Sequence, residues 1–164
     1  SSDLGRIGKA IAKRGEAFGP KIIYHSRTKQ DVAYPYFDKL EDMARACDIL
    51  VVATPGGPQT NNLIDARILD ALGPDGILIN IARGTVVDED ALISALKERR
   101  ILTAGLDVFA KEPQVPAELL AIPHIAVAPH VGSATHTTRA AMGQLVRDNL
   151  AAHFAGKPLI SPVP

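Results

Sequence analysis

Residues 76–109 read GILINIARGTVVDEDALISALKERRILTAGLDVF, which is two short apolar runs with a helical pattern between them. The runs, at 76–81 and 101–109, are largely apolar on both faces, which is typical of strands buried in a parallel sheet. Asp88 is a good helix N-cap, and the two acids that follow it favour the positive end of the helix dipole. The stretch therefore predicts a strand–helix–strand unit with its helix over 88–98.

The same alternation continues on both sides of this unit. We predict strands over 21–26, 48–53, 76–81, 101–109 and 125–129. We predict helices over 6–18, 38–46, 65–72, 88–98 and 115–121, and a longer last helix that stops at Gly156 and Pro158. Strands and helices in this order predict an α/β fold with a doubly wound parallel sheet.

Composition narrows the possible partners. The 164 residues are enough for one domain with a sizeable core. Lys plus Arg and Asp plus Glu both number 18, so the formal charge is zero and we expect no nucleic acid. No apolar run reaches the ~18 residues of a membrane span, so we expect no membrane partner. Cys47, the only cysteine, suits a reducing compartment, so we expect a cytoplasmic protein with a core thiol.

The N-terminal stretch Leu4-Gly5-Arg6-Ile7-Gly8 has the form of the second half of a dinucleotide-binding turn, G-x-G-x-x-G. In such a turn Gly5 lets backbone amides approach the pyrophosphate, and Gly8 lets the helix pack closely on the sheet. Asp3 stands where the first glycine is expected. Taken alone, the turn fits a helix start rich in small residues as well as it fits a cofactor site.

The end of the second predicted strand favours NADP over NAD. An acid that binds the ribose of NAD is expected about 20 residues after the glycines. Here the chain reads Tyr24-His25-Ser26-Arg27-Thr28, with no acid. Arg27 can pair with a 2′-phosphate, and Ser26 or Thr28 can donate to it. We predict NADP, with NAD as the alternative cofactor; a solvated loop arginine is the other structural interpretation.

Chemically useful side chains follow three of the predicted strands. Arg83 comes after 76–81, Asp107 and Glu112 come at and after the end of 101–109, and His130 follows 125–129. Ligands of open α/β sheets bind at the carboxyl ends of the strands. Each residue alone has an ordinary explanation as a surface charge, a loop residue or a buried imidazole. The functional interpretation therefore depends on the occurrence of all four residues in this order at strand ends.

The stretches LGRIGKAIA, NIARG, GLDVFAKEP and PHVGSAT, in this order, resemble the cofactor-binding domain of the D-isomer-specific 2-hydroxyacid dehydrogenases over nearly the whole chain. The turn YHSRTK is similar to that of the NADPH-using glyoxylate and hydroxypyruvate reductases of the family. The resemblance implies a Rossmann-like sheet, hydride transfer between NAD(P)H and a small 2-keto or 2-hydroxy acid, and a homodimer.

The resemblance also implies roles, and the chemistry of keto-acid reduction agrees with them. Arg83 matches the arginine that holds the substrate carboxylate and polarises the ketone. His130 matches the general acid, and Glu112 matches the partner that fixes its tautomer and keeps it protonated. Asp107 matches the residue that orients the nicotinamide carboxamide. A third ligand at metal-site spacing from His130 and Glu112 is missing, so we predict no metal.

The cofactor contacts that the resemblance implies come from several segments. They are Gly5, Arg6 and Ile7 at the pyrophosphate; Ser26, Arg27 and Thr28 at the adenosine end; Thr54 and Pro55 at the adenosine pocket; and Ile81, Ala82, Gly132 and Ser133 at the nicotinamide.

The chain also departs from the family pattern. The first strand of the dinucleotide fold and an N-terminal substrate domain are absent from this sequence, so we expect a fragment whose sheet is incomplete at the N-terminus. We predict a dinucleotide-binding domain over 1–135, and over 136–164 a C-terminal helix and tail that return toward the missing domain. We expect the isolated chain to bind NADPH weakly and to turn over little substrate.

Two alternatives within the same fold remain open at this point. Some relatives are NAD(P)-sensing corepressors that bind partner proteins and keep the same three residues. Formate dehydrogenases form another branch, but there the histidine's partner is a glutamine, and Glu112 argues against that assignment.

Overall fold

The computed structural model describes residues 4–162. Contacts within the chain divide it into two units, Ser1–Pro129 and His130–Pro164, and each is described by itself. The predicted division, into a dinucleotide-binding domain over 1–135 and a helix with its tail over 136–164, stays a prediction. Asp3, which departs from the glycine pattern, lies outside the described residues.

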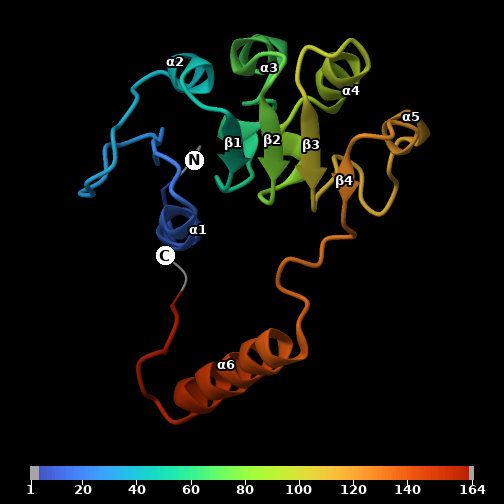
Figure 1. Cartoon of the computed structure of the whole chain (residues 1–164). Coiled ribbons are helices and arrows are strands. Elements are labelled where there is room, and N and C mark those ends of the chain that lie inside the picture. Colours follow the sequence, from blue (N-terminus) through green and yellow to red (C-terminus); the bar gives the residue numbers. More distant parts are fainter. Residues whose placement is uncertain (1–3, 163–164) are drawn as a thin grey trace. The chain divides into compact units, whose positions relative to one another are not determined.

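The first unit is built on a parallel sheet of four strands (Figure 1). In spatial order the strands are β1 (Ile49–Val52), β2 (Ile77–Asn80), β3 (Thr103–Leu106) and β4 (Ala126–Val127). All neighbouring pairs are parallel, because each connection between strands crosses back through a helical segment. The predicted α/β fold with a parallel, Rossmann-like sheet is confirmed.

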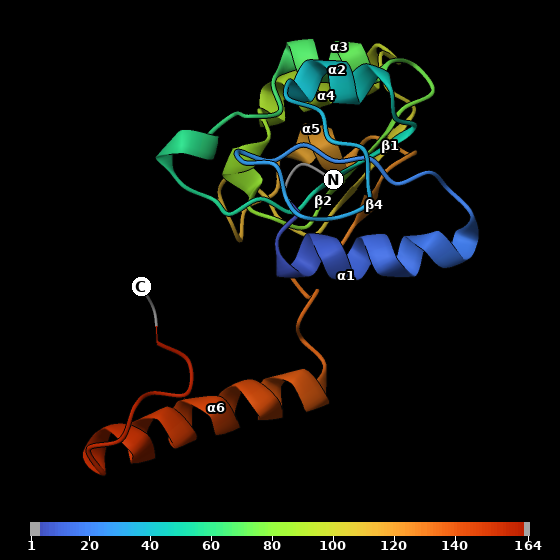
Figure 2. The same cartoon turned by 90° about the vertical axis from the view of Figure 1, so that its left-hand side faces the viewer.

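Helices and single helical turns precede the first strand and connect the strands. They are α1 (Arg6–Gly15), η1 (Glu16–Phe18), α2 (Leu40–Arg45), η2 (Pro58–Thr60), α3 (Ala66–Leu72), η3 (Gly84–Val86), α4 (Glu89–Lys97) and α5 (Ala117–Leu120). Figure 2 shows the sheet with α2, α3 and α4 on one side and α1 on the other. None of the described helices is both long and apolar enough to cross a membrane.

The main core lies between the sheet and the layer of α2, α3 and α4. Alternate strand residues are buried, namely Leu50, Val52, Leu78, Asn80, Ala104 and Leu106. The helices contribute Leu69, Leu92 and Leu96 to the same core. Burial of each such leucine stabilises the fold by roughly 1.5–3 kcal/mol. The one amide in the strand row, Asn80, ends β2 and belongs to the candidate site.

Aspartates cap two of the helices that cover the sheet. The Asp88 carboxylate accepts from the amide of Ala91 at 3.0 Å at the start of α4, which confirms the predicted cap. The Asp65 carboxylate accepts from the amide of Ile68 at 3.1 Å at the start of α3. Both bonds satisfy amides that have no acceptor within the helix.

The strand predicted over 21–26 is wrong in extent. The segment forms a single parallel bridge, between Tyr24 and Tyr36. The Tyr24 amide donates to the carbonyl of Pro35, and the Phe37 amide donates to the carbonyl of Tyr24. Pro35 has no amide proton, so the partner segment cannot extend the ladder through that residue.

The second unit is dominated by α6 (His136–Phe154), the predicted long last helix. The Thr135 hydroxyl accepts from the amide of Thr138 and caps its start. Gly156, with φ of 65°, follows its end, as predicted. The Asn149 side chain accepts from the amides of Ile160 and Ser161, which holds the tail back along the helix.

Candidate active site

Residues predicted at the adenosine end of the cofactor lie around one cavity. Arg27, Thr54 and Pro55 line it, and the loop through η2 completes its wall. The cavity has a volume of about 260 Å³. Thr54 is buried, whereas Arg27 and Pro55 are exposed. The fold therefore brings Arg27 together with Thr54 and Pro55, which lie 27 or more residues away in the sequence.

Two tyrosines shape the loop that carries Arg27. The Tyr24 hydroxyl accepts from the amide of Gln30 and donates to its carbonyl. The Tyr36 hydroxyl donates to the carbonyl of Ser26 at 3.2 Å. The Ser26 hydroxyl, which we predict as a phosphate donor, instead donates to the carbonyl of Thr28 at 2.7 Å and is buried. Arg27 and Thr28 are exposed, so the loop presents these two side chains.

The start of α1 carries the residues predicted at the pyrophosphate. Gly5 has extended backbone and precedes the helix, and no described side chain caps it. Arg6 and Ile7, in the first turn, are exposed. The first amides of a helix have no acceptor within it and favour anions. Gly8 is buried on the inner side of α1, beside Ala12, as expected for a close helix contact.

The register of the sheet aligns the ends of three neighbouring strands. Val52 pairs with Asn80, and Asn80 pairs with Leu106. Thr54, Arg83 and Asp107 follow these aligned residues along the chain. Because the strands are parallel, all three residues come at the same edge of the sheet, where ligands of such folds bind.

Asn80 holds the turn that presents Arg83. Its side-chain nitrogen donates to the carbonyl of Arg83 at 3.1 Å, and its side-chain oxygen accepts from the amide of Ala82 at 3.0 Å. Asn80 is only 1% exposed, so both bonds are shielded from water. Asn80 is not among the residues predicted from the sequence, although a lone amide at the end of a buried strand indicates such a role.

The Arg83 side chain lies against the backbone of the neighbouring loop. A Cβ atom on Gly56 would stand 2.6 Å from the Arg83 Cγ, so the glycine leaves the space that the arginine stem fills. The guanidinium donates to the carbonyl of Ala82 at 2.7 Å. Ala82 is buried and Ile81, predicted beside it at the nicotinamide, is 37% exposed.

Asp107 and Glu112 lie on the segment that follows β3. The Asp107 amide donates to the carbonyl of Asn80 at 3.0 Å, which ties this segment to the end of β2. The exposed Glu112 carboxylate accepts from the amide of Phe109 at 3.0 Å. Arg83, Asp107 and Glu112 therefore all belong to the first unit.

His130, Gly132 and Ser133 belong to the second unit, and all three are exposed. His130 has a φ of 54°, which is rare for a residue with a side chain. Such backbone strain costs about 1–3 kcal/mol and concentrates at functional sites. The predicted meeting of His130 with Arg83 and Glu112 joins two units and stays a prediction.

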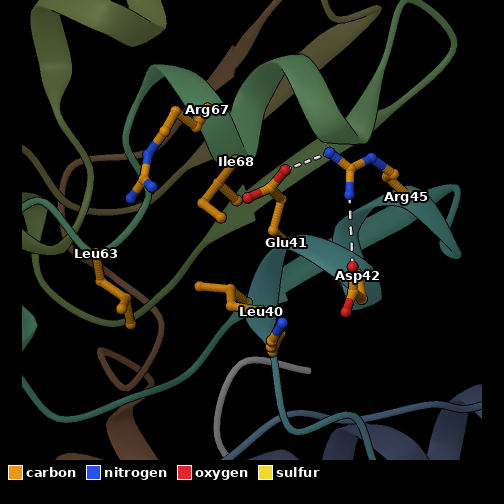
Figure 3. A pocket seen from close by; sticks show the side chains of 8 residues that line it. Leu40, Glu41, Asp42, Arg45, Leu63, Arg67 and Ile68 are labelled. Carbon is orange, nitrogen blue, oxygen red and sulfur yellow. Dashed lines mark hydrogen bonds and ion pairs between the residues drawn. The ribbon is translucent and has the colours of Figure 1, made fainter.

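A larger cavity, of about 540 Å³, lies between α2 and α3 and contains none of the predicted site residues. Figure 3 shows Arg45 paired with Glu41 and Asp42 on its rim. Its charges are of both signs and partly paired with each other, so we assign it no ligand. Within residues 4–162, no group of three His, Cys, Asp or Glu side chains is arranged to hold a metal ion.

Comparison with known proteins places the chain in a family. A family model described as the NAD binding domain of D-isomer specific 2-hydroxyacid dehydrogenases matches residues 3–132. Glyoxylate/hydroxypyruvate reductase A of Arabidopsis thaliana is 55% identical over 161 residues, which are 98% of this chain and 51% of that protein. Hydroxyphenylpyruvate reductase of Plectranthus scutellarioides is 52% identical over the same shares of the two chains.

A solved structure of a relative agrees with this family assignment. The NADPH-dependent glyoxylate/hydroxypyruvate reductase of Sinorhizobium meliloti, in complex with NADP and malonate, is 49% identical, with a TM-score of 0.97 over 99% of this chain and 51% of that one. The chain thus spans about half the length of the relatives that it matches. The match covers the turn before α1 and all four strands, and on it the chain belongs to the D-isomer specific 2-hydroxyacid dehydrogenase family.

Proposed function

We propose that the full-length protein that contains this chain is an NADPH-dependent reductase of small 2-keto acids such as glyoxylate and hydroxypyruvate. The proposal depends mainly on the parallel register of β1, β2 and β3. This register places Thr54, Arg83 and Asp107 at the same edge of the sheet. Relatives of the same family are reductases of 2-keto acids, which supports the choice of substrate class.

NADPH, when bound, supplies the hydride that reduces the ketone. The Arg83 guanidinium binds the substrate carboxylate and withdraws charge from the carbonyl. The His130 imidazolium donates a proton to the carbonyl oxygen as negative charge develops there. Glu112 accepts a hydrogen bond from the other ring nitrogen, which fixes the tautomer and the orientation of the ring. The product is the 2-hydroxy acid, with the proton on its new hydroxyl.

In this proposal, the exposed side chains of Arg27 and Thr28 contact the 2′-phosphate, and Ser26 maintains the shape of their loop. Gly5, Arg6 and Ile7 contact the pyrophosphate. The solved relative that binds NADP supports the choice of NADP over NAD. Removal of the phosphate contact then affects NADPH and spares NADH.

Arg27→Ala tests the cofactor assignment. A hydrogen bond to a charged group is worth about 1.5–3 kcal/mol, so we expect KM for NADPH to rise by roughly 10- to 100-fold and KM for NADH to stay unchanged. Steady-state kinetics with both cofactors measure this. Arg67→Ala, which removes an exposed arginine from α3, is the matched control. Equal losses with NADPH and NADH would show that Arg27 does not bind the 2′-phosphate.

The reductase assignment itself is tested by oxidation of NADPH with a panel of 2-keto acids and the full-length protein. We expect turnover with glyoxylate or hydroxypyruvate, and loss of at least about 100-fold in kcat for His130→Ala. Absence of turnover with every member of the panel overturns the assignment.

The proposal extends to a homodimer, which the family resemblance implies, and to a cytoplasmic location, which the single cysteine suits. Light scattering of the full-length protein at micromolar concentration tests the dimer, and cell fractionation tests the location.

A further inference from the structure

The backbone of Phe109 and Ala110, just before Glu112, is packed directly against the turn that follows Arg83. A Cβ atom on Gly84 would stand 1.9 Å from the carbonyl carbon of Phe109 and 2.3 Å from the amide nitrogen of Ala110. Backbone thus lies on backbone, and only glycine fits at position 84. This contact fixes the distance between the two loops, but it does not fix the direction in which the amides of the second loop point.

A carboxylate from α4 accepts a hydrogen bond from one of these amides. Glu89, in the first turn of α4, accepts from the amide of Ala110 at 3.2 Å. Asp88 already caps this helix, so the Glu89 carboxylate is not needed for the cap. Glu89 and Ala110 are both half-buried, whereas Asp90, the next acid in the same turn, is exposed.

The neighbouring amide of the same loop binds Glu112. The Phe109 amide donates to the Glu112 carboxylate, and the Ala110 amide donates to the Glu89 carboxylate. These amides lie in consecutive peptide planes that share the Cα atom of Phe109, so a displacement of one plane shifts the end of the other. The Glu112 and Glu89 carboxylates therefore hold adjacent amides of one loop.

We propose that Glu89 is a positioning residue for Glu112: it holds the loop before Glu112 so that this carboxylate faces the general acid. The inference rests on the proposed function, in which Glu112 orients the His130 imidazole. Glu89 acts only through the loop and has no contact with substrate. A displacement of about 1 Å in a catalytic group is enough to lower a rate by roughly 100-fold.

The experiment compares three variants of the full-length protein: Glu89→Ala, Glu89→Gln and Asp90→Ala. Glu89→Ala removes the acceptor, Glu89→Gln keeps a side-chain oxygen at the same place, and Asp90→Ala removes the same charge from the same helical turn. Hydrogen–deuterium exchange at the Phe109 and Ala110 amides reports the loop directly. Steady-state kinetics with NADPH and the best 2-keto acid report its consequence.

For Glu89→Ala we expect faster exchange at both amides, by about tenfold or more, and a fall in kcat of about tenfold with KM for NADPH unchanged. Glu89→Gln is expected to restore both readouts, and Asp90→Ala to leave them as in the wild type. Rescue by glutamine separates a role in hydrogen bonding from a role of the charge alone.

Unchanged exchange at both amides in Glu89→Ala overturns the inference, and so does a kcat equal to that of Asp90→Ala. The proposed function is tested separately by Glu112→Gln in the same assay. If that variant keeps the wild-type rate, the role of Glu112 is wrong. The exchange data then still decide whether Glu89 holds the loop.

Discussion

At the scale of single residues, Gly56 and Asn80 determine how Arg83 is presented. Asn80 bonds the backbone on either side of the Ala82–Arg83 peptide, and Gly56 leaves the space in which the arginine stem lies. Neither residue is charged, and neither can act as an acid or a base. Both act by fixing a guanidinium whose long side chain otherwise samples many rotamers, and such preorganisation is what an oriented substrate requires.

Gly56→Ala tests this at the residue scale. The added methyl group would meet the Arg83 Cγ at 2.6 Å and its Cβ at 3.0 Å, so the stem has to move. We expect kcat/KM for the 2-keto acid to fall by roughly 10- to 100-fold, because the guanidinium no longer faces the carboxylate. Kinetics of the full-length protein measure the effect. Gly143→Ala, whose methyl group meets only the tip of Arg147 at 3.8 Å, is the control. Equal kinetics for both variants would contradict the proposed contact.

Only some residues of the candidate site could be predicted from their residue type. Arg83 and Glu112 attract attention because charged groups at strand ends are chemically useful. Gly56 and Glu89 do not, because their roles depend on which loops the fold packs together.

The Cys47 thiol agrees with the prediction of a core residue: it packs against the main core, and burial raises its pKa above the ordinary value.

At the scale of elements, the Asp65 cap makes the stability of α3 depend on pH. Burial opposes ionisation of Asp65, but the amide of Ile68 and the side chain of Arg67 outweigh it and lower the pKa of Asp65 below its ordinary value. Because the pKa is lower in the folded protein than in the unfolded chain, the carboxylate stabilises the fold above about pH 4. This contribution is lost as the pH falls toward the folded-state pKa.

Asp65→Ala is therefore expected to lower the free energy of unfolding by about 1 kcal/mol at pH 7 and by less at pH near 3. Denaturant unfolding of the full-length protein at the two pH values measures the difference. Asp65→Asn keeps a side-chain acceptor without the charge, so its cap is expected to be independent of pH. A constant loss for Asp65→Ala at both pH values would show that the ionised carboxylate is not what caps α3.

Elements that depend on local pattern were the ones that could be predicted. The strands β1, β2 and β3 lie inside the predicted runs because each run is apolar on both faces. The segment over 21–26 also contains apolar residues, yet it forms one bridge, since its pairing depends on the neighbouring segment, where Pro35 lacks an amide proton. Pairing partners are set by tertiary contacts, which a single run does not encode.

At the scale of the whole molecule, large apolar side chains are exposed along the sheet. Ile49 of β1 is 52% exposed, Val127 of β4 is 45% exposed, and Ile81, after β2, is 37% exposed. Exposed apolar groups on a sheet favour association with other surfaces. In the isolated chain, we expect association through these side chains to compete with the arrangement of the loops that binds the cofactor.

We therefore expect the isolated 164-residue chain to self-associate and to bind NADPH weakly, with a Kd well above the micromolar range. Titration of NADPH fluorescence, with light scattering on the same samples, measures both properties. The full-length protein is the control and is expected to bind more tightly. Micromolar binding by a monomeric isolated chain would contradict this expectation.

The order of motifs along the chain predicted the family, but not the geometry that joins them. Arg83 and Glu112 follow strands that the register places side by side, so their common edge was predictable. His130 follows β4 but begins the second unit, so strand order alone does not determine its position. No local pattern specifies this position.

A crystal structure of the full-length protein with NADPH and an unreactive 2-keto acid analogue would show whether Arg83, Glu112 and His130 meet at the substrate. We predict that the Arg83 guanidinium binds the analogue's carboxylate at about 2.7–2.9 Å. The His130 ring is predicted to lie between Glu112 and the analogue's carbonyl oxygen, at about 2.6–3.2 Å from each. A His130 ring beyond hydrogen-bond reach of Glu112, or an Arg83 guanidinium directed away from the analogue, would contradict the proposed roles of these residues.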